Sequence, residues 1–174
     1  MLGRTVSSLA LAGTLAFLAT GCGVDADSST LTLAESKSPV QLLRNEVATR
    51  IPSMIIHGAV NEDFSEACGD DESIRSWHSS VRLDIGASDS TDAESIVNDL
   101  TASFEKDGWI PAPVLEGPEQ KQAVYTKSGT AAEIHITAEN GDEFEKTVLV
   151  SVFGPCVQTD GPESDEVTSL ESRN

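Results

Sequence analysis

The clearest pattern of apolar positions in the chain lies between residues 91 and 108 and has the period of a helix. Apolar side chains recur there every three or four positions, which places them on one face of an amphipathic helix. These positions are Ala93, Ile96, Val97, Leu100 and Phe104. Thr91 and Glu94 match a capping box at the start of the segment, and Gly108 is a typical C-terminal stop. The pattern therefore predicts a helix between Thr91 and Gly108 with the apolar stripe buried.

A second helical period occurs earlier in the chain. Its apolar positions are Val40, Leu43, Val47 and Ile51. Ser38 can cap such a helix with Gln41 completing a capping box, and Pro39 suits the first helical position. Pro52 predicts the end of the helix, and the apolar residues 54–60 after it are expected to pack as a short irregular extension.

Residues 77–85 alternate between two faces, which is the period of a half-exposed strand. The positions that share the buried face are Trp77, Ser79, Val81, Leu83 and Ile85. His78, Arg82 and Asp84 share the other face, which is expected to be in contact with water.

Three more strands are predicted toward the C-terminus. They cover residues 122–126, 131–138 and 146–153. In the second of these strands, Glu133 and His135 lie on the wet face, opposite the isoleucines. Asn140 and Gly141 form a strong turn signal, so the last two strands are predicted to pair as a hairpin.

This order of elements predicts one α+β domain over residues 38–157. We expect a roughly four-stranded antiparallel sheet with two helices packed on one face and one disulfide. Residues 22–37 are rich in Ser, Thr and Asp and are expected to form a flexible tether. Residues 158–174 are polar and acidic and are expected to form a disordered tail.

The chain is strongly acidic, with a formal net charge of −18 at pH 7. Such a charge repels phosphate backbones and anionic lipid head groups, so nucleic acid is not an expected partner. A solubilising acidic surface explains the charge without a ligand. Association with a cationic partner or with calcium is left open.

An apolar stretch from Leu9 to Ala19 follows Arg4 near the N-terminus. It is too short to span a bilayer, which requires about 20 apolar residues. Small residues follow this stretch and precede Cys22. The layout predicts a secretory signal peptide.

The last residues of this segment, Ala19-Thr20-Gly21-Cys22, resemble the lipobox of bacterial lipoproteins. In that family a Leu usually stands three residues before the Cys; here Ala19 holds that place and Leu18 lies one residue earlier. The resemblance implies removal of residues 1–21, lipidation of Cys22, and attachment to the outer, extracytoplasmic face of the cell membrane through diacylglyceryl and palmitate chains. The alternative is an ordinary signal peptide that is cleaved elsewhere.

The rest of the chain loosely resembles small lipoproteins of unknown function from high-GC Gram-positive bacteria. The likeness lies in the order of a tether, a helix, a Cys, a helix that ends in Gly-Trp, strands and a late Cys. It implies no role for any individual residue.

The chain contains three cysteines, and lipidation of Cys22 would leave Cys68 and Cys156. In an exported chain the simplest account of two cysteines is a disulfide between them. A reactive or metal-binding pair is the alternative, but neither cysteine lies in a CxxC motif or near clustered histidines. We therefore predict a structural disulfide.

Candidate chemistry is limited to a few polar side chains. His78 and His135 could form a metal or acid–base site with Asp84 or Glu133 if their strands were neighbours, and solvated surface histidines are the alternative. Asp142 is a candidate calcium ligand in the turn after residue 140, where solvated carboxylates are the simpler interpretation. The chain contains no GxSxG or GxGxxG motif and no serine in a nucleophile context, so no cofactor is predicted.

The sequence as a whole predicts a lipid-anchored extracytoplasmic protein with a non-catalytic binding or scaffolding role at the cell envelope. Its partner, whether an envelope protein or a small molecule, is not indicated. One alternative is an envelope hydrolase or metal-dependent enzyme that uses the two histidines. A second alternative is a binding module that responds to cations.

Overall fold

The computed structural model describes residues 31–86, 92–112, 120–127, 130–140 and 146–173. Its helices are α1 (Leu33–Thr49), the short 3-10 turn η2 (Ser53–Ile55), α2 (Ala93–Lys106) and α3 (Asp165–Glu171). Its strands are β1 (Ile56–Cys68), β2 (Asp71–Ile85), β3 (Ile110–Pro111), β4 (Gln120–Thr126), β5 (Glu133–Asn140), β6 (Lys146–Phe153) and β7 (Val157–Gln158). The predicted signal peptide and the predicted lipidation at Cys22 lie outside the described residues.

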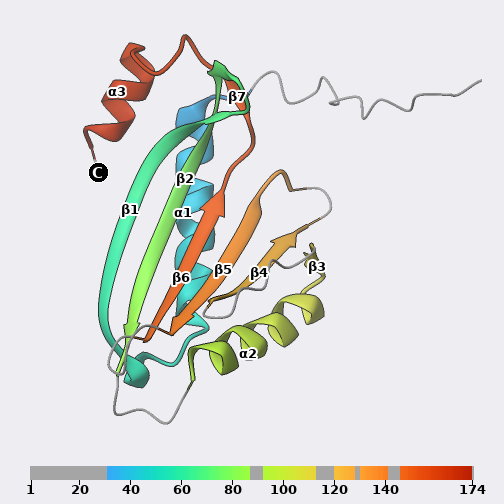
Figure 1. Cartoon of the computed structure of the whole chain (residues 1–174). Coiled ribbons are helices and arrows are strands. Elements are labelled where there is room, and N and C mark those ends of the chain that lie inside the picture. The colour runs from blue at the N-terminus through green and yellow to red at the C-terminus, as the bar shows by residue number, and fades with distance from the viewer. Residues whose placement is uncertain (1–30, 87–91, 113–119, 128–129, 141–145, 174) are drawn as a thin grey trace, which may run out of the picture.

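The strands form one antiparallel sheet with the order β1-β2-β6-β5-β4-β3, and β7 pairs with the start of β2 (Figure 1). The prediction of an α+β fold with a disulfide is confirmed, whereas the sheet has seven described strands and not about four. The hairpin predicted from Asn140 and Gly141 is present as the β5–β6 pair. The turn residues 141–145 lie outside the described residues.

The largest difference from the prediction is β1, which covers most of the segment that was expected to be irregular. It is an edge strand that pairs with β2 along nearly its whole length, and its register shifts between Ile56 and Gly58 and between Ala67 and Cys68. Its positions on the helix side include Asp63 and Ser65, which are polar. Because polar residues stand where a strand pattern needs apolar ones, alternation did not reveal β1.

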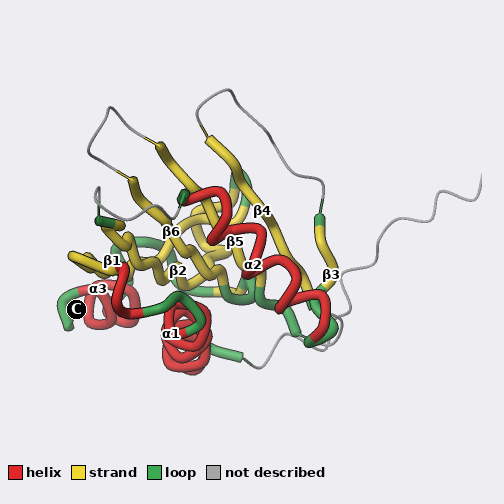
Figure 2. The backbone as a smooth tube through the Cα atoms, turned by 90° about the horizontal axis from the view of Figure 1, so that it is seen from below, coloured by secondary structure: helices red, strands yellow, loops and turns green. Residues whose placement is uncertain are grey.

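All three described α-helices pack on one face of the sheet (Figure 2). α1 lies against β2 and β6, where Lys37 Nζ sits 4.4 Å from the centre of the Trp77 ring. α2 lies against β4 and β5, where the Tyr125 hydroxyl donates to Thr101 Oγ1 at 2.6 Å. The prediction that two helices share a face is confirmed, and α3 joins them.

The helix between Thr91 and Gly108 formed as its apolar pattern predicts. Every residue of the predicted stripe is buried in α2. Asp92 is the N-cap and accepts from the Glu94 amide, whereas Thr91 lies outside the described residues. Gly108 adopts a positive φ of 82°, which is the left-handed conformation that ends a helix and favours glycine.

α1 begins earlier than predicted. Thr32 and Glu35 form the capping box, so the helix starts at Leu33 and Pro39 lies inside it. Leu33 is fully buried, and burying this side chain favours the longer helix. Residues 33–37 of the predicted tether are therefore helical.

The C-terminal segment also differs from the prediction, because residues 159–171, expected to be disordered, pack on the domain. Val167 and Leu170 of α3 are buried. The Glu171 carboxylate accepts from the backbone amide and the hydroxyl of Ser65 at 3.0 and 2.8 Å. Lys37 donates to the Leu170 carbonyl at 2.8 Å. These contacts attach α3 to β1 and α1. No described helix is long and apolar enough to cross a membrane.

Candidate functional site

The face of the sheet opposite the helices, which we call the open face, carries a row of aromatic side chains. In the strand register Phe64 of β1 pairs with His78 of β2, His78 pairs with Phe153 of β6, and Phe153 pairs with Glu133 of β5. Directly paired residues on adjacent strands point to the same face, so these four side chains form one continuous row across the sheet.

His78 lies within this row between two phenylalanines. Its ring stacks on Phe153 with a centroid distance of 4.4 Å and meets the edge of Phe64 at 4.5 Å. Both ring nitrogens are buried and have no hydrogen-bond partner among the described residues. Burial lowers the pKa of His78, and the nearby carboxylates of Glu66 and Glu62 oppose this shift. His78 is therefore neutral at neutral pH and acts as an apolar side chain.

His135 extends the row on β5. Its ring centre lies 4.7 Å from that of Phe153. Its Nε2 contacts the Glu133 carboxylate, and the Gln122 side-chain amide nitrogen lies 3.4 Å from its Nδ1. Because an amide nitrogen can only donate, Nδ1 accepts and Nε2 carries the hydrogen donated to Glu133.

The two histidines therefore lie on one face, as predicted, but they do not face each other. β6 separates β2 from β5, and the Phe153 ring stands between His78 and His135. Asp84 lies near the far end of β2, where its carboxylate accepts from Arg82 Nε at 3.4 Å. Of the contacts predicted among His78, His135, Asp84 and Glu133, only the one between His135 and Glu133 formed. No group of three or more His, Cys, Asp or Glu among the described residues could hold a metal ion, and Asp142 lies outside them.

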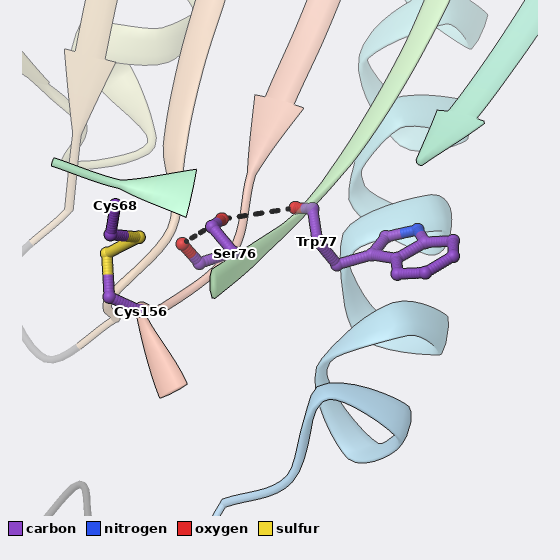
Figure 3. The surroundings of a disulfide bond; sticks show 5 residues. Cys68, Ser76, Trp77 and Cys156 are labelled. Atoms are coloured by element: carbon purple, nitrogen blue, oxygen red, sulfur yellow. Dashed lines mark hydrogen bonds between the residues drawn. A yellow bond between two sulfur atoms is a disulfide. The ribbon is translucent and has the colours of Figure 1, made fainter. Parts of the chain in front are cut away.

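The disulfide predicted between Cys68 and Cys156 is present (Figure 3). It joins the end of β1 to the segment between β6 and β7, with the two Cα atoms 6.1 Å apart. Nearby, the Ser76 hydroxyl donates to the Gly154 carbonyl at 2.9 Å, and the Gly154 amide donates to the Trp77 carbonyl. A Cβ on Gly154 would lie 2.9 Å from Val40, so glycine lets this segment pass close to α1.

A groove of about 710 Å³ lies over the end of β6, beside this disulfide. We call it the disulfide groove. Glu66 lines it on the β1 side, and Glu133 and His135 line it on the β5 side. Phe153 and Pro155 lie between these two sides. The groove thus combines an aromatic ring with a carboxylate on each side, and none of the described residues that line it is Lys or Arg.

A second hollow of about 680 Å³, the helix-side cleft, lies on the other face of the sheet. It runs between α1 and the segment that follows α2, and its lining includes Pro39, Leu43, Trp109 and Lys127. Lys127 Nζ lies 5.6 Å from the centre of the Trp109 ring. This cleft therefore holds Lys127 together with Glu35 and Glu46, whereas the described lining of the disulfide groove includes no Lys or Arg.

Sequence reasoning did not find Phe64, Glu66 or Phe153 as members of a site. Phe64 and Glu66 belong to β1, which was not predicted as a strand. The signal for Phe153 was its position, because it alternates with the buried valines of β6 and so falls on the open face.

Comparison of the chain with protein-family models, with curated proteins and with solved structures finds no match.

Proposed function

We propose that this chain is a lipid-anchored extracytoplasmic protein with a non-catalytic binding role at the cell envelope. The observation that carries the proposal is the disulfide groove, an aromatic hollow of about 710 Å³ on a sheet face that no described helix covers. Its volume falls within the range of small-molecule sites, about 300 to 1,000 Å³.

The anchoring part of the proposal rests on the lipobox-like residues Ala19 to Cys22. The Cys68–Cys156 bond supports it, because structural disulfides persist mainly in oxidising compartments outside the cytoplasm. Only Cys22 is then left for a lipid.

The partners of the polar groups in the groove favour binding over catalysis. Both nitrogens of His135 already have partners, namely Glu133 and Gln122, and the Ser76 hydroxyl donates to a backbone carbonyl. A nucleophile–base pair requires a hydroxyl or thiol hydrogen-bonded to the imidazole. The described groove instead presents fixed side chains against which a ligand can pack.

The binding role can be tested by nuclear magnetic resonance on the full mature chain with a fragment library of neutral, cationic and anionic compounds. We expect at least one chemical class to shift resonances of Phe153, His135 and their strand neighbours. Resonances of Leu43 and Trp109 in the helix-side cleft serve as the internal reference. If no compound shifts the groove resonances, or if the chain turns over a substrate there, the proposal is wrong.

A further inference from the structure

We infer that the disulfide groove binds an organic cation, such as an ammonium or guanidinium group that carries an apolar body. This inference rests on the proposed binding role and specifies its ligand class. It follows from three properties of the groove, which are its charge, its aromatic surface and its shape.

The charge of the groove is negative from both sides. Glu66 approaches from β1 and Glu133 from β5, and the part of the lining that the structure describes includes no Lys or Arg. The Glu133 side chain keeps 45% of its surface exposed, although its carboxylate contacts His135 Nε2. The formal net charge of −18 adds a long-range attraction for cations.

The aromatic surface suits a cation as well. Phe153 lines the groove, with the His78 ring stacked on it at 4.4 Å and the His135 ring tilted against it at 4.7 Å. A cation over an aromatic face is stabilised by the ring quadrupole. Since His78 has no exposed nitrogen and is enclosed between two phenylalanines, it places no positive charge against the Phe153 ring.

The shape of the groove admits more than a bare ion. Its volume accommodates a small organic molecule, and the Cys68–Cys156 disulfide together with Pro155 adds apolar contact surface. The same chemistry is presented by a free organic cation and by a Lys or Arg side chain of a polypeptide. The probes below include both sources.

The test is a titration of the full mature chain with the probes below, in which nuclear magnetic resonance records the shifts of the groove resonances. Choline and agmatine represent free cations, a short lysine-containing peptide represents the polypeptide source, and 3,3-dimethylbutanol is the neutral analogue of choline. We expect the cations to shift resonances of Phe153 and His135 and the neutral analogue to bind at least fivefold more weakly. The salt concentration is then raised from 20 to 300 mM, which increases the ionic strength by roughly one order of magnitude. Binding of the cations should weaken over this range.

Glutamine variants test the contribution of each carboxylate charge while keeping the size of the side chain. Glu133→Gln keeps an oxygen that accepts from His135 but removes the charge, and Glu66→Gln removes the other carboxylate. Each should weaken cation binding by about two- to fivefold, the effect of one partly exposed ion pair. Glu105→Gln, the same change on the exposed surface of α2, should leave binding unchanged. Phe153→Leu should weaken binding by a similar factor through loss of the aromatic face.

The outcomes distinguish this inference from the proposed function. Equal binding of 3,3-dimethylbutanol and choline, or unchanged cation affinity in both glutamine variants, would show that the ligand class is wrong while the binding role stands. The absence of any groove shift with these probes and with the fragment library would overturn both. Preferential binding of either the free cations or the lysine peptide supports the inference and identifies the source.

Discussion

The ring of His78 lies nearly parallel to that of Phe153, at 7° with a centroid separation of 4.4 Å, and neither of its nitrogens has a hydrogen-bond partner. This cross-strand stack joins β2 to β6 at the point where the disulfide groove begins. A polar ring enclosed in this way costs free energy, because it gives up its hydrogen bonds to water without replacing them. The ring therefore has a measurable effect on stability.

We predict that His78→Phe raises the free energy of unfolding by roughly 1 kcal/mol at pH 7.5, because the variant keeps the stack and removes two buried unpartnered nitrogens. The difference should grow as the pH falls below 6.5, the ordinary pKa of histidine. In that range the unfolded wild-type chain binds a proton that the folded chain, with its lowered pKa, does not. Urea unfolding of both proteins between pH 5 and 8 measures this difference.

Glu105→Gln, an exposed change on α2, provides a control variant whose overall stability should match the wild type. A constant difference between wild type and His78→Phe from pH 5 to 8 would show that His78 titrates as freely in the folded chain as in the unfolded one.

We predict that the Cys68–Cys156 bond contributes about 4 to 5 kcal/mol to stability, since it closes a loop with a sequence separation of 88 residues. The double variant Cys68→Ala/Cys156→Ala should lose this amount in urea unfolding. Mass spectrometry of a non-reduced digest should show the two peptides linked. Reduction of the wild-type protein should bring its stability close to that of the double variant, and no change on reduction would contradict the prediction.

We predict that α3 is part of the cooperative fold. Leu170→Ala should lower the free energy of unfolding by about 2 kcal/mol, because it removes a buried side chain at the contact of α3 with the domain. Ser169→Ala, an exposed change in the same helix, should have little effect. Equal stability of the two variants would mean that α3 does not contribute to folding.

We predict that the mature protein begins at Cys22 and carries lipid there. Intact-mass spectrometry of protein extracted from membranes should give the mass of residues 22–174 plus a diacylglyceryl group and acyl chains. Cys22→Ser removes the thiol that accepts the lipid, so the variant should lose this added mass and leave the membrane fraction. A variant that stays in the membranes as fully as the wild type would rule out the anchor.

Local periodicity revealed the elements whose buried faces are continuous and apolar. The α2 stripe is the clearest case, since all its predicted positions are buried. The apolar pattern did not reveal β1, because the polar residues Asp63 and Ser65 occupy positions on its helix side. Their side chains bond to residues that are distant in the sequence. Arg44 of α1 binds Asp63 at 3.1 Å, and Glu171 of α3 binds Ser65. α3 contributes only Val167 and Leu170 to the core, too few to form a recognisable period.

The site was predictable only in part for the same reason. Alternation placed His78, His135 and Glu133 correctly on one face. It could not show that β6 inserts between β2 and β5, because strand order depends on pairings that are distant in the sequence. Phe153 therefore occupies the position between the two histidines where the sequence had suggested a metal.

The edge position of β1 has a consequence if the protein carries the proposed lipid anchor. Many copies would then share one membrane plane at high local concentration, where the part of this 13-residue edge strand that α3 does not contact could pair with the same strand of a neighbour. Two register shifts interrupt this edge, and Glu62 and Glu66 give it a charge that repels an identical edge. We therefore expect the strand that supplies one side of the groove also to oppose edge-to-edge pairing of neighbouring copies.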